Sequence, residues 1–412
     1  MKKYMIEIII RTTIWIAFVA YGSFITVACD KEIRRPEVVA PIMPDMGPEG
    51  TVGTIGSASV RTVSVFSAGT GNQVYRIPSI ITANDGTVLV FCENRHESWV
   101  DKSHTDIVCK RSSDNGKTWS EESNITGGIN GGDFAFMDPA PVLDSETGKI
   151  FLFFTRWNKL NADVRNNRAF VSVSSDNGTN WSDPQDITDN IILGGKYSAG
   201  FGPGHGIEIK EGRKAGRLIV ISRQSDGSSS GCYSIYSDDH GLAWNCGQPT
   251  SAGEAQIAEA GIDKLHLNIR RGSYRYVSTS VDGGESWSTS THDSSLPQID
   301  GGCEASVLGT GKNMVFYCGP QGGPVSAGHD NRYGLKLFRS AAGALYWSKS
   351  QILYQNASGY SDMTILNDGS LAIIFEAGSD KGFIKRANRT PGWMRLDFMV
   401  LPPEVTDYGY WF

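Results

Sequence analysis

The pattern Ser-x-Asp-x-Gly-x-x-Trp constrains the fold of this chain more than any other feature, because it occurs four times. The copies lie at 112–119, 174–181, 237–244 and 280–287. In each copy, Asp can accept hydrogen bonds from the backbone amides of a tight turn, Gly can supply a positive φ angle, and Trp can bury a large ring. Short apolar or alternating runs, such as 106–110 and 169–173, precede the copies and predict strands that lead into these turns.

The spacing of the copies predicts a repeat architecture. The Trp residues of the four copies and of a decayed fifth copy at 340–347 lie 62, 63, 43 and 60 residues apart. Repeats of this length are typical of propellers and arrays of short strands. The 48 Gly residues and the scarcity of helical periodicity agree with an all-β chain of many turns. We therefore expect one all-β propeller domain over residues 59–412.

The first 58 residues have a different character. Lys2 and Lys3 precede a largely apolar run at 12–28 that ends at Cys29. This order predicts a lipoprotein-type signal peptide over 1–28, with Cys29 as the lipidated first residue of an exported protein, either periplasmic or at the cell surface, or secreted. A transmembrane anchor is the alternative, but the run is short for a span. The Pro-rich stretch 29–58 predicts a flexible tether.

Charge and cysteine content limit the partners and cofactors. The formal net charge of −6 argues against nucleic-acid binding, and an anionic ligand would need a local cluster of cations. Six cysteines besides Cys29 allow several disulfide pairings, of which we favour Cys232 with Cys246 because they flank the third copy of the pattern. The chain has no Cys-x-x-Cys or His-rich spacing, so we expect neither a metal site nor a cofactor.

Several further segments appear in a fixed order around the repeats. They are Arg76-Ile77-Pro78, Glu93-Asn94-Arg95 with Asp101, Met137-Asp138-Pro139, Trp157, the Gly-Pro-Gly-His-Gly-Ile run at 202–207, Glu254-x-Gln256, Arg270, Arg332, Tyr360 and Glu376. This order resembles the bacterial exo-sialidases (neuraminidases) that carry an Arg-Ile-Pro motif and Asp-box (BNR) repeats on a six-bladed β-propeller. The resemblance implies that fold, with the Asp-box turns on the rim opposite the active site.

The same resemblance implies roles for individual residues. Asp101 would be the general acid and base, Tyr360 the nucleophile, and Glu254 the base that activates Tyr360. Glu376 would hold one of the substrate-binding arginines, Arg76, in place. The expected substrate-contacting residues are Arg76, Arg95, Met137, Asp138, Trp157, Arg270 and Arg332. The 202–207 run is assigned no role. Arg271 is an alternative to Arg270, and Glu97 and Asp106 are alternatives to Asp101.

The chemistry of sialic acid gives a reason for these residue types. Its anomeric carbon carries a carboxylate, which three guanidiniums can bind through forked hydrogen bonds. The same carboxylate would repel an anionic nucleophile, whereas a neutral phenol avoids this repulsion. We therefore expect a retaining, monomeric exo-α-sialidase that acts on sialylated glycans, glycoproteins and glycolipids. The alternatives are a trans-sialidase, a non-catalytic sialoglycan-binding propeller, and a propeller that cleaves another polysaccharide with paired carboxylates.

Overall fold

The computed structural model describes residues 51–55, 58–67, 73–129, 132–158, 164–192, 194–322, 331–378 and 395–407. The chain divides into two compact units, Met1–Val39 and Ala40–Phe412, and all described residues belong to the second. The predicted signal peptide, Cys29 and the tether up to residue 50 lie outside the described residues. Strand β1 (Thr51–Ile55) pairs with β2 (Ala58–Ser67), so strand pairing already begins inside the range predicted as tether. Its Thr- and Val-containing sequence suits a strand.

The described residues form an all-β structure, as the sequence predicts, with four hydrogen-bonded sheets. The first sheet joins β1 and β2 to β25 (Arg395–Leu401), β24 (Leu371–Ala377), β23 (Lys349–Ile365), β22 (Tyr333–Ser340), β21 (Val315–Pro320) and β20 (Ser306–Gly309). The second contains β3 (Val74–Thr82), β4 (Val88–Arg95), β5 (Thr105–Ser112), β6 (Ser123–Asn124), β7 (Phe134–Leu143), β8 (Ile150–Asn158), β9 (Arg168–Ser174) and β10 (Gln185–Asp186).

The other two sheets are smaller. One contains β11 (Tyr197–Phe201), β12 (Ile207–Glu208), β13 (Leu218–Ser225), β14 (Ser230–Ser237) and β15 (Asn245–Cys246). The last contains β16 (Glu254–Gly261), β17 (Lys264–Arg271), β18 (Tyr274–Ser280) and β19 (Thr291–His292). Helical structure in the described part is limited to η1 (Val164–Asn166), α2 (Thr188–Ile191) and η2 (Pro403–Thr406), and none of these helices is long and apolar enough to cross a membrane.

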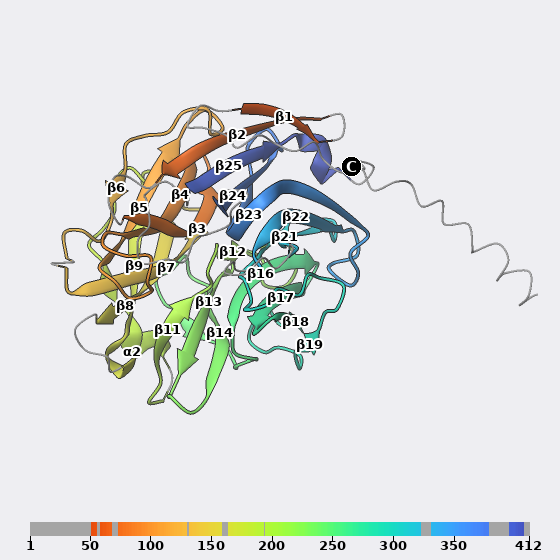
Figure 1. Cartoon of the computed structure of the whole chain (residues 1–412). Helices are drawn as coiled ribbons and strands as arrows, with labels where there is room; N and C mark the ends of the chain where they lie inside the picture. Colours follow the sequence, from red (N-terminus) through yellow and green to blue (C-terminus); the bar gives the residue numbers. More distant parts are fainter. Residues whose placement is uncertain are drawn as a thin grey trace, which may run out of the picture. The chain divides into compact units, whose positions relative to one another are not determined.

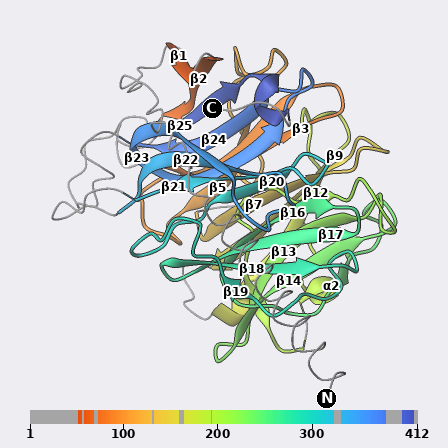
Figure 2. The same ribbon diagram turned by 90° about the vertical axis from the view of Figure 1, so that its right-hand side faces the viewer.

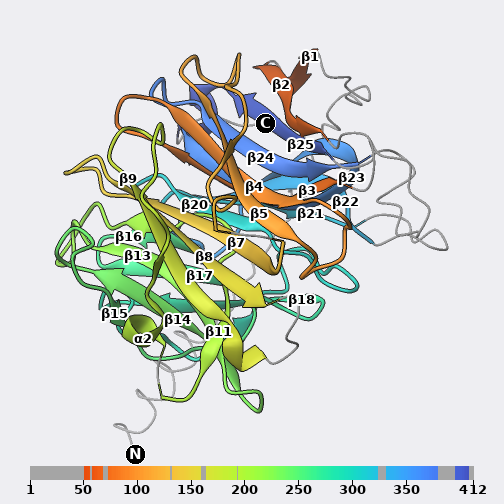
Figure 3. The same cartoon turned by 90° about the vertical axis from the view of Figure 1, so that its left-hand side faces the viewer.

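In the second unit the sheets follow one another in chain order around a central region (Figure 1). Figure 3 shows β4 and β5 beside β7 and β8, and Figure 2 shows β16 to β18 beside β13 and β14. Strand β3 contacts β7, β16 contacts β20, and β23 contacts β3, so strands from distant parts of the sequence meet at the centre. The predicted number of six blades stays a prediction.

The hydrophobic core lies between neighbouring sheets. Phe151 and Phe153 of β8, for example, pack in one cluster with Phe201 of β11 and Leu218 of β13. Strands in the middle of a sheet are therefore covered on both faces, and β4 is buried along its whole length. Because both faces of such strands are buried, their sequences are continuous apolar runs with no alternation of polar residues.

The repeated turns fold as the pattern predicts. In the first copy, Ser112 Oγ accepts a hydrogen bond from the backbone N–H of Gly116 at 2.8 Å, and Asp114 Oδ1 accepts those of Lys117 and Thr118 at 2.9 Å. Trp119 packs edge-on against Phe398, with ring centroids 5.2 Å apart. Because Phe398 lies on β25, the turn after β5 joins two strand groups that are far apart in the sequence.

The decayed fifth copy keeps this geometry without its Asp and Gly. Ser340 Oγ accepts the backbone N–H of Ala344 at 3.1 Å, and Ala344 adopts a φ of 59° at the position that Gly occupies in the complete copies. Trp347 Nε1 donates to Asp293 Oδ2 at 3.1 Å. The serine and the partly buried Trp ring are therefore sufficient to keep the turn.

The disulfide favoured from the sequence is wrong, because Cys232 and Cys246 are both free. Cys246 of β15 lies opposite Ile235 of β14, three residues along the strand from Cys232. Three residues of strand span roughly 10 Å, more than the limit of about 7 Å between the Cα atoms of a disulfide. The other four cysteines in the described part of the chain, Cys92, Cys109, Cys303 and Cys318, are also free.

The close approach at Gly116 gives a test of how the turns stabilise the fold. A Cβ atom at Gly116 would lie 2.1 Å from the Phe398 ring, and φ is +74°. We predict that Gly116→Ala lowers the free energy of unfolding by about 2 to 4 kcal/mol, measured by urea denaturation. Gly128→Ala, with open space around it, should change it by less than about 0.5 kcal/mol. Equal effects of the two changes would contradict this account.

Candidate active site

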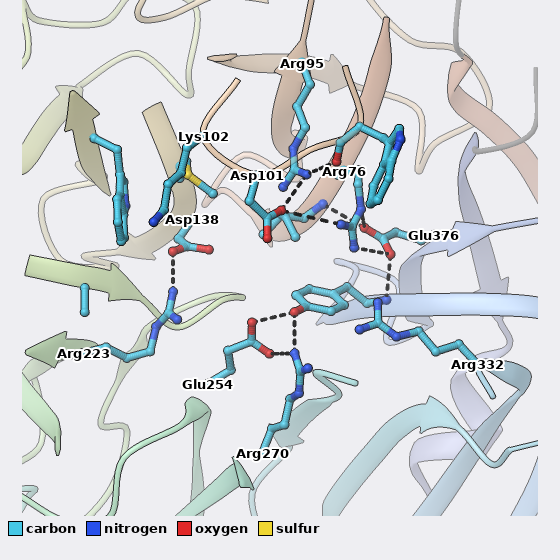
Figure 4. A pocket seen from close by; sticks show the side chains of 16 residues that line it. Arg76, Arg95, Asp101, Lys102, Asp138, Arg223, Glu254, Arg270, Arg332 and Glu376 are labelled. Carbon is cyan, nitrogen blue, oxygen red and sulfur yellow. Dashed lines mark hydrogen bonds and ion pairs between the residues drawn. The ribbon is translucent and has the colours of Figure 1, made fainter. Parts of the chain in front are cut away.

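A cavity of about 470 Å³ is lined by residues from all four sheets (Figure 4). All eleven site residues predicted from the sequence line it, and the residues not predicted are Ile77, Trp99, Lys102, Ala199 and Arg223. In the described part of the chain, the lining includes none of the Asp-box turns. Six Arg or Lys side chains and four carboxylates line the cavity, so its balance is cationic although the chain as a whole is acidic.

Two similar backbone irregularities direct side chains into the cavity. Ile77 on β3 has a φ of 56° and Asp138 on β7 a φ of 58°, and each directly precedes a proline. The strand pairing shifts register at both places, between Arg76 and Ser79 and between Met137 and Ala140. Such bulges redirect side chains. Positive φ before proline is strained, and this strain coincides with two segments that the sequence singles out.

Glu254 and Arg270 meet because they face each other across a hairpin. Glu254, the first residue of β16, is paired with Arg270 of β17. Arg270 Nη1 donates to Glu254 Oε2 at 2.5 Å and to the hydroxyl oxygen of Tyr360 at 2.8 Å. The Tyr360 hydroxyl in turn donates to Glu254 Oε1 at 2.5 Å. The phenol thus directs its proton at a carboxylate and its oxygen at a guanidinium.

The charges around this contact favour an ionised carboxylate beside a neutral phenol. Burial alone would raise the pKa of Glu254, but Arg270 and Arg223 outweigh it and hold the pKa below its ordinary value. Tyr360 is 5 % exposed, and burial followed by the charge of Glu254 raises its pKa well above the ordinary value. A base in hydrogen-bond contact with a hydroxyl is the arrangement that activates a nucleophile.

Arg76, Arg270 and Arg332 lie around Tyr360. The guanidinium carbons of Arg76 and Arg332 are each 5.4 Å from the centroid of the Tyr360 ring. Arg332 Nε and Nη2 donate to the carbonyl of Gly302 at 3.2 and 3.0 Å. Three fixed guanidiniums in one cavity can bind a carboxylate through several charge-assisted hydrogen bonds.

Glu376 on β24 connects two of these groups. It accepts hydrogen bonds from Arg76 Nε at 2.9 Å and Nη2 at 3.2 Å, and from the backbone N–H groups of Ile77 and Tyr360 at 3.1 and 3.2 Å. Burial would raise the pKa of Glu376, but the charge of Arg76 outweighs it and lowers the pKa. Glu376 therefore fixes both Arg76 and the backbone at Tyr360.

Asp101 lies on the loop between β4 and β5, with its side chain 68 % exposed. Its Oδ1 accepts a hydrogen bond from Arg95 Nη1 at 2.7 Å and lies 4.0 Å from Arg76 Nη1. The neighbouring protein atoms partly desolvate Asp101 and would raise its pKa, but the charges of Arg95 and then Arg76 outweigh this effect, so the pKa lies below the ordinary value. In the free protein Asp101 is therefore ionised at neutral pH.

Glu93 holds in place the arginine that contacts this loop. It is fully buried, and its Oε2 accepts Arg95 Nε at 2.8 Å and Nη2 at 2.6 Å. Its Oε1 accepts the backbone N–H of Asp138 at 3.0 Å. One carboxylate thus links the arginine that contacts Asp101 to the bulge on β7.

The opposite wall of the cavity combines an ion pair with an aromatic contact. Arg223 Nη2 pairs with Asp138 Oδ2, and burial raises the pKa of Asp138 to about 7 although Arg223 opposes the shift. Lys102, beside Asp101 on the same loop, places its ammonium 4.0 Å from the centroid of the Trp157 ring. Cation–π contact of this kind holds the loop against β8.

The structure separates the predicted residues from their alternatives. Arg271 points away from the cavity, with its guanidinium 5.1 Å from the Tyr276 ring, because successive residues of a strand face opposite sides. Glu97 and Asp106 are absent from the described lining of the cavity. Asp106 is buried, and its carboxylate accepts hydrogen bonds from Asn124 and Thr126.

Sequence reasoning assigned no role to Arg223, and none to Glu93 although it singled out the segment Glu93-Asn94-Arg95. Both lie at the ends of buried strand runs, where a charged side chain is unusual unless it is paired. That signal could have singled them out, although it could not have identified their partners.

One group in the described residues has the composition of a metal site. His96, His104 and Asp106 have ligand atoms within 4.8 Å of one another, at the base of the Asp101 loop. The two imidazole rings are tilted against each other, with centroids 4.3 Å apart and planes at 33°. The expectation of no metal stays a prediction.

Comparison with known proteins places this geometry in context. Residues 130–373 match the family described as BNR repeat-like domain. The chain is 29 % identical over 350 residues to the sialidase of Micromonospora viridifaciens and 28 % over 355 residues to that of Bacteroides fragilis (strain YCH46). These alignments cover 78 % and 76 % of this chain, but only 52 % and 62 % of the two relatives. The chain thus spans about half to three fifths of their length.

Solved structures share the fold. The Hadza microbial sialidase Hz136 superposes with a TM-score of 0.67 at 24 % identity, covering 81 % of this chain and 66 % of that one. The intramolecular trans-sialidase from Ruminococcus gnavus, in complex with oseltamivir carboxylate, superposes with a TM-score of 0.64 at 19 % identity, covering 84 % and 98 %.

The pairing of Arg270 with Glu254 leads to a prediction about protonation. Arg270→Ala removes the main countercharge of Glu254 and leaves its burial largely unchanged, so the pKa of Glu254 should rise. The shift can be followed by ¹³C NMR of glutamate carboxyl carbons, with Glu254→Gln to assign the signal. Arg271→Ala is the matched control and should leave this pKa unchanged. A similar shift in both variants would mean that Arg270 is not the countercharge.

Proposed function

Because this chain belongs to the BNR repeat-like domain family, we propose that it is a retaining exo-α-sialidase that hydrolyses terminal sialic acids from glycoconjugates. The observation that carries the proposal is the contact of Tyr360 with Glu254 and Arg270 inside a cationic cavity. The sialidase names of the curated relatives support the same activity. We further propose that the leader at 1–28 exports the protein and that Cys29 carries its lipid anchor.

We also propose that the fold has six blades of about four strands. Two observations support this division. Strand β23 pairs with β22 up to Ala357 and with β24 from Ser358, and β5 joins β7 only through the single pair Thr105 and Ala135. Dividing the two large sheets at these places leaves two groups from each, beside the two smaller sheets.

In the proposed complex, the arginine triad binds the sialic acid carboxylate. Arg76, Arg270 and Arg332 surround the Tyr360 ring, so a carboxylate held by them would place the anomeric carbon near the phenol oxygen. The remaining lining, which includes Arg95, Met137, Asp138 and Trp157, would contact the rest of the sugar. The balance of charge in the cavity suits a monoanionic sugar.

The first chemical step forms a bond between the Tyr360 oxygen and the anomeric carbon. Glu254 takes the phenol proton, and Asp101 gives a proton to the leaving oxygen as its bond to the anomeric carbon breaks. In the second step water attacks the anomeric carbon and gives its proton to Asp101. The Tyr360 oxygen leaves and regains its proton from Glu254. Two displacements at one carbon retain its configuration.

A trans-sialidase is the second candidate, because Trp99, on the same loop as Asp101, lines the cavity where it could stack on an acceptor sugar. A solved intramolecular trans-sialidase also shares the fold, although intramolecular transfer needs no separate acceptor sugar. The test is incubation with α2,3-, α2,6- and α2,8-linked sialosides, with and without excess lactose. Free sialic acid in the presence of lactose supports the hydrolase. Exclusive transfer to lactose supports the second candidate, and no turnover of any sialoside contradicts both.

The covalent step gives a direct prediction for Tyr360. A 3-fluoro-sialosyl fluoride should label the wild-type protein, and peptide mass mapping should locate the label on Tyr360. Tyr360→Phe should not be labelled, and Glu254→Gln should be labelled far more slowly, because a phenol with an ordinary pKa near 10 supplies little phenolate at neutral pH. Label on another side chain would refute the assignment of the nucleophile.

The environment of Asp101 gives a prediction about leaving groups. Arg95 and Arg76 lower the pKa of Asp101 in the free protein, and a bound carboxylate would neutralise Arg76 and let this pKa rise. The general acid must be protonated, so the rate should fall as pH rises through this pKa. The alkaline limb of kcat should therefore lie at higher pH than that of kcat/KM for sialyl-lactose.

A matched pair of substrates checks the same assignment. Asp101→Asn should lose about 100-fold or more in kcat/KM with sialyl-lactose, but less than about tenfold with a nitrophenyl sialoside, whose leaving group needs no proton. Equal losses with the two substrates would show that Asp101 is not the acid.

A further inference from the structure

Asp362 is a fully buried carboxylate next to the cavity whose surroundings are unusually complete. Its Oδ2 accepts the backbone N–H groups of Ile80 at 2.9 Å and of His205 at 3.0 Å. Its Oδ1 accepts Gln256 Nε2 at 2.7 Å and the backbone N–H of Met363 at 2.9 Å, and lies 2.7 Å from His205 Nδ1. A carboxylate can only accept hydrogen bonds, so His205 Nδ1 must be the protonated ring nitrogen that donates.

The contact between Gln256 and Asp362 repeats the contact between Glu254 and Tyr360. Gln256 follows Glu254 by two residues on β16, and Asp362 follows Tyr360 by two residues on β23. Residues two apart on a strand share a face, so the two contacts are consecutive side-chain contacts between the same two strands, and each is called a rung below. In the described sheets β16 and β23 are not paired through their backbones, so side chains connect them here.

The other end of this rung is fixed as well. Gln256 Oε1 accepts the backbone N–H of Val307 on β20 at 2.5 Å, which orients its amide. A Cβ at Gly204 would lie 1.6 Å from Gln256 Nε2, and Gly204 has a φ of +96°. Gly202 O accepts the backbone N–H of Ala255 at 2.9 Å. The 202–207 run, to which sequence analysis assigned no role, thus packs against Gln256 and limits where its side chain can lie.

Asp362 also reaches the strand that carries Arg76. Ile80 follows the bulge between Arg76 and Ser79 on β3, and its N–H is bound by Asp362 Oδ2. One carboxylate therefore connects β3, β16 and β23, which supply Arg76, Glu254 and Tyr360.

We propose that Asp362 is a positioning residue that, through Gln256, sets the distance between the Tyr360 hydroxyl and the Glu254 carboxylate. This inference rests on the proposed function, since it concerns activation of the same nucleophile. Asp362 does not line the cavity in the described residues, and it acts through the strands that carry the reacting groups.

The first test is Asp362→Asn. The Asn amide directs N–H groups at the hydrogen-bond donors that surround residue 362. The hydrogen bond between residue 362 and Gln256 is then lost, and the resulting separation of β16 and β23 displaces Tyr360 from Glu254. Because a displacement of about 1 Å can cost 100-fold, kcat for sialyl-lactose should fall about 100-fold. KM should change less than threefold, because the arginines are unaltered. The rate of Tyr360 labelling should fall with kcat.

The second test is rescue. In Asp362→Asn combined with Gln256→Glu, the amide and the carboxylate exchange places across the same hydrogen bond, and His205 can accept by changing tautomer. The kcat of this double variant should be at least tenfold higher than that of Asp362→Asn alone, which a purely structural role would not predict.

Asp144→Asn is the matched control. Asp144 is 1 % exposed, accepts several hydrogen bonds and lies in the turn after β7, so this change should lower Tm but leave kcat unchanged.

The outcomes separate this inference from the proposed function. A wild-type protein that turns over no sialoside refutes the function. An active wild type with Asp362→Asn within threefold of its kcat refutes the inference alone, as does a double variant that recovers nothing. If Asp362→Asn does not fold, Gln256→Met replaces it as the test variant. This change removes the hydrogen bond between residue 256 and Asp362 and leaves the other partners of Asp362 in place. A tenfold or greater loss of kcat there supports the inference, and a smaller loss refutes it.

Discussion

The contact of Tyr360 with Glu254 and Arg270 is the interaction on which the rest of the site depends. A buried carboxylate next to a buried phenol would be unfavourable alone, since burial disfavours charge on either group. Arg270 compensates the carboxylate at 2.5 Å and also donates to the phenol oxygen at 2.8 Å. The arginine therefore allows Glu254 to remain ionised and ready to accept a proton from a phenol that is otherwise hard to ionise.

The fold supplies these three groups by two different routes. Glu254 and Arg270 come from one hairpin and meet through backbone pairing, whereas Tyr360 comes from β23 and meets them only through side chains. Groups brought together from separate sheets need additional fixation. Buried carboxylates provide it: Glu376 holds Arg76 and the backbone of Tyr360, and Asp362 connects β3, β16 and β23.

Much of this arrangement could be predicted from the sequence, for two different reasons. The Asp-box turns are recognisable from local chemistry, because Ser, Asp, Gly and Trp each act within eight residues, whereas the eleven site residues were named from segments whose order resembles the exo-sialidases. Arg223 and Glu93 received no role because Asp138, which both contact, lies on another strand. The Cys232–Cys246 pairing failed for the same reason, since proximity in sequence does not fix the register between strands.

Retention of configuration requires two displacements at the anomeric carbon, so it tests directly whether a covalent intermediate, assigned here to Tyr360, forms. The measurement is ¹H NMR of sialic acid released from α-linked sialyl-lactose, recorded before the anomers equilibrate. The account predicts that the α-anomer appears first and the β-anomer accumulates later by mutarotation. If the β-anomer is the first product, water attacks the anomeric carbon directly, and the role assigned to Tyr360 is contradicted.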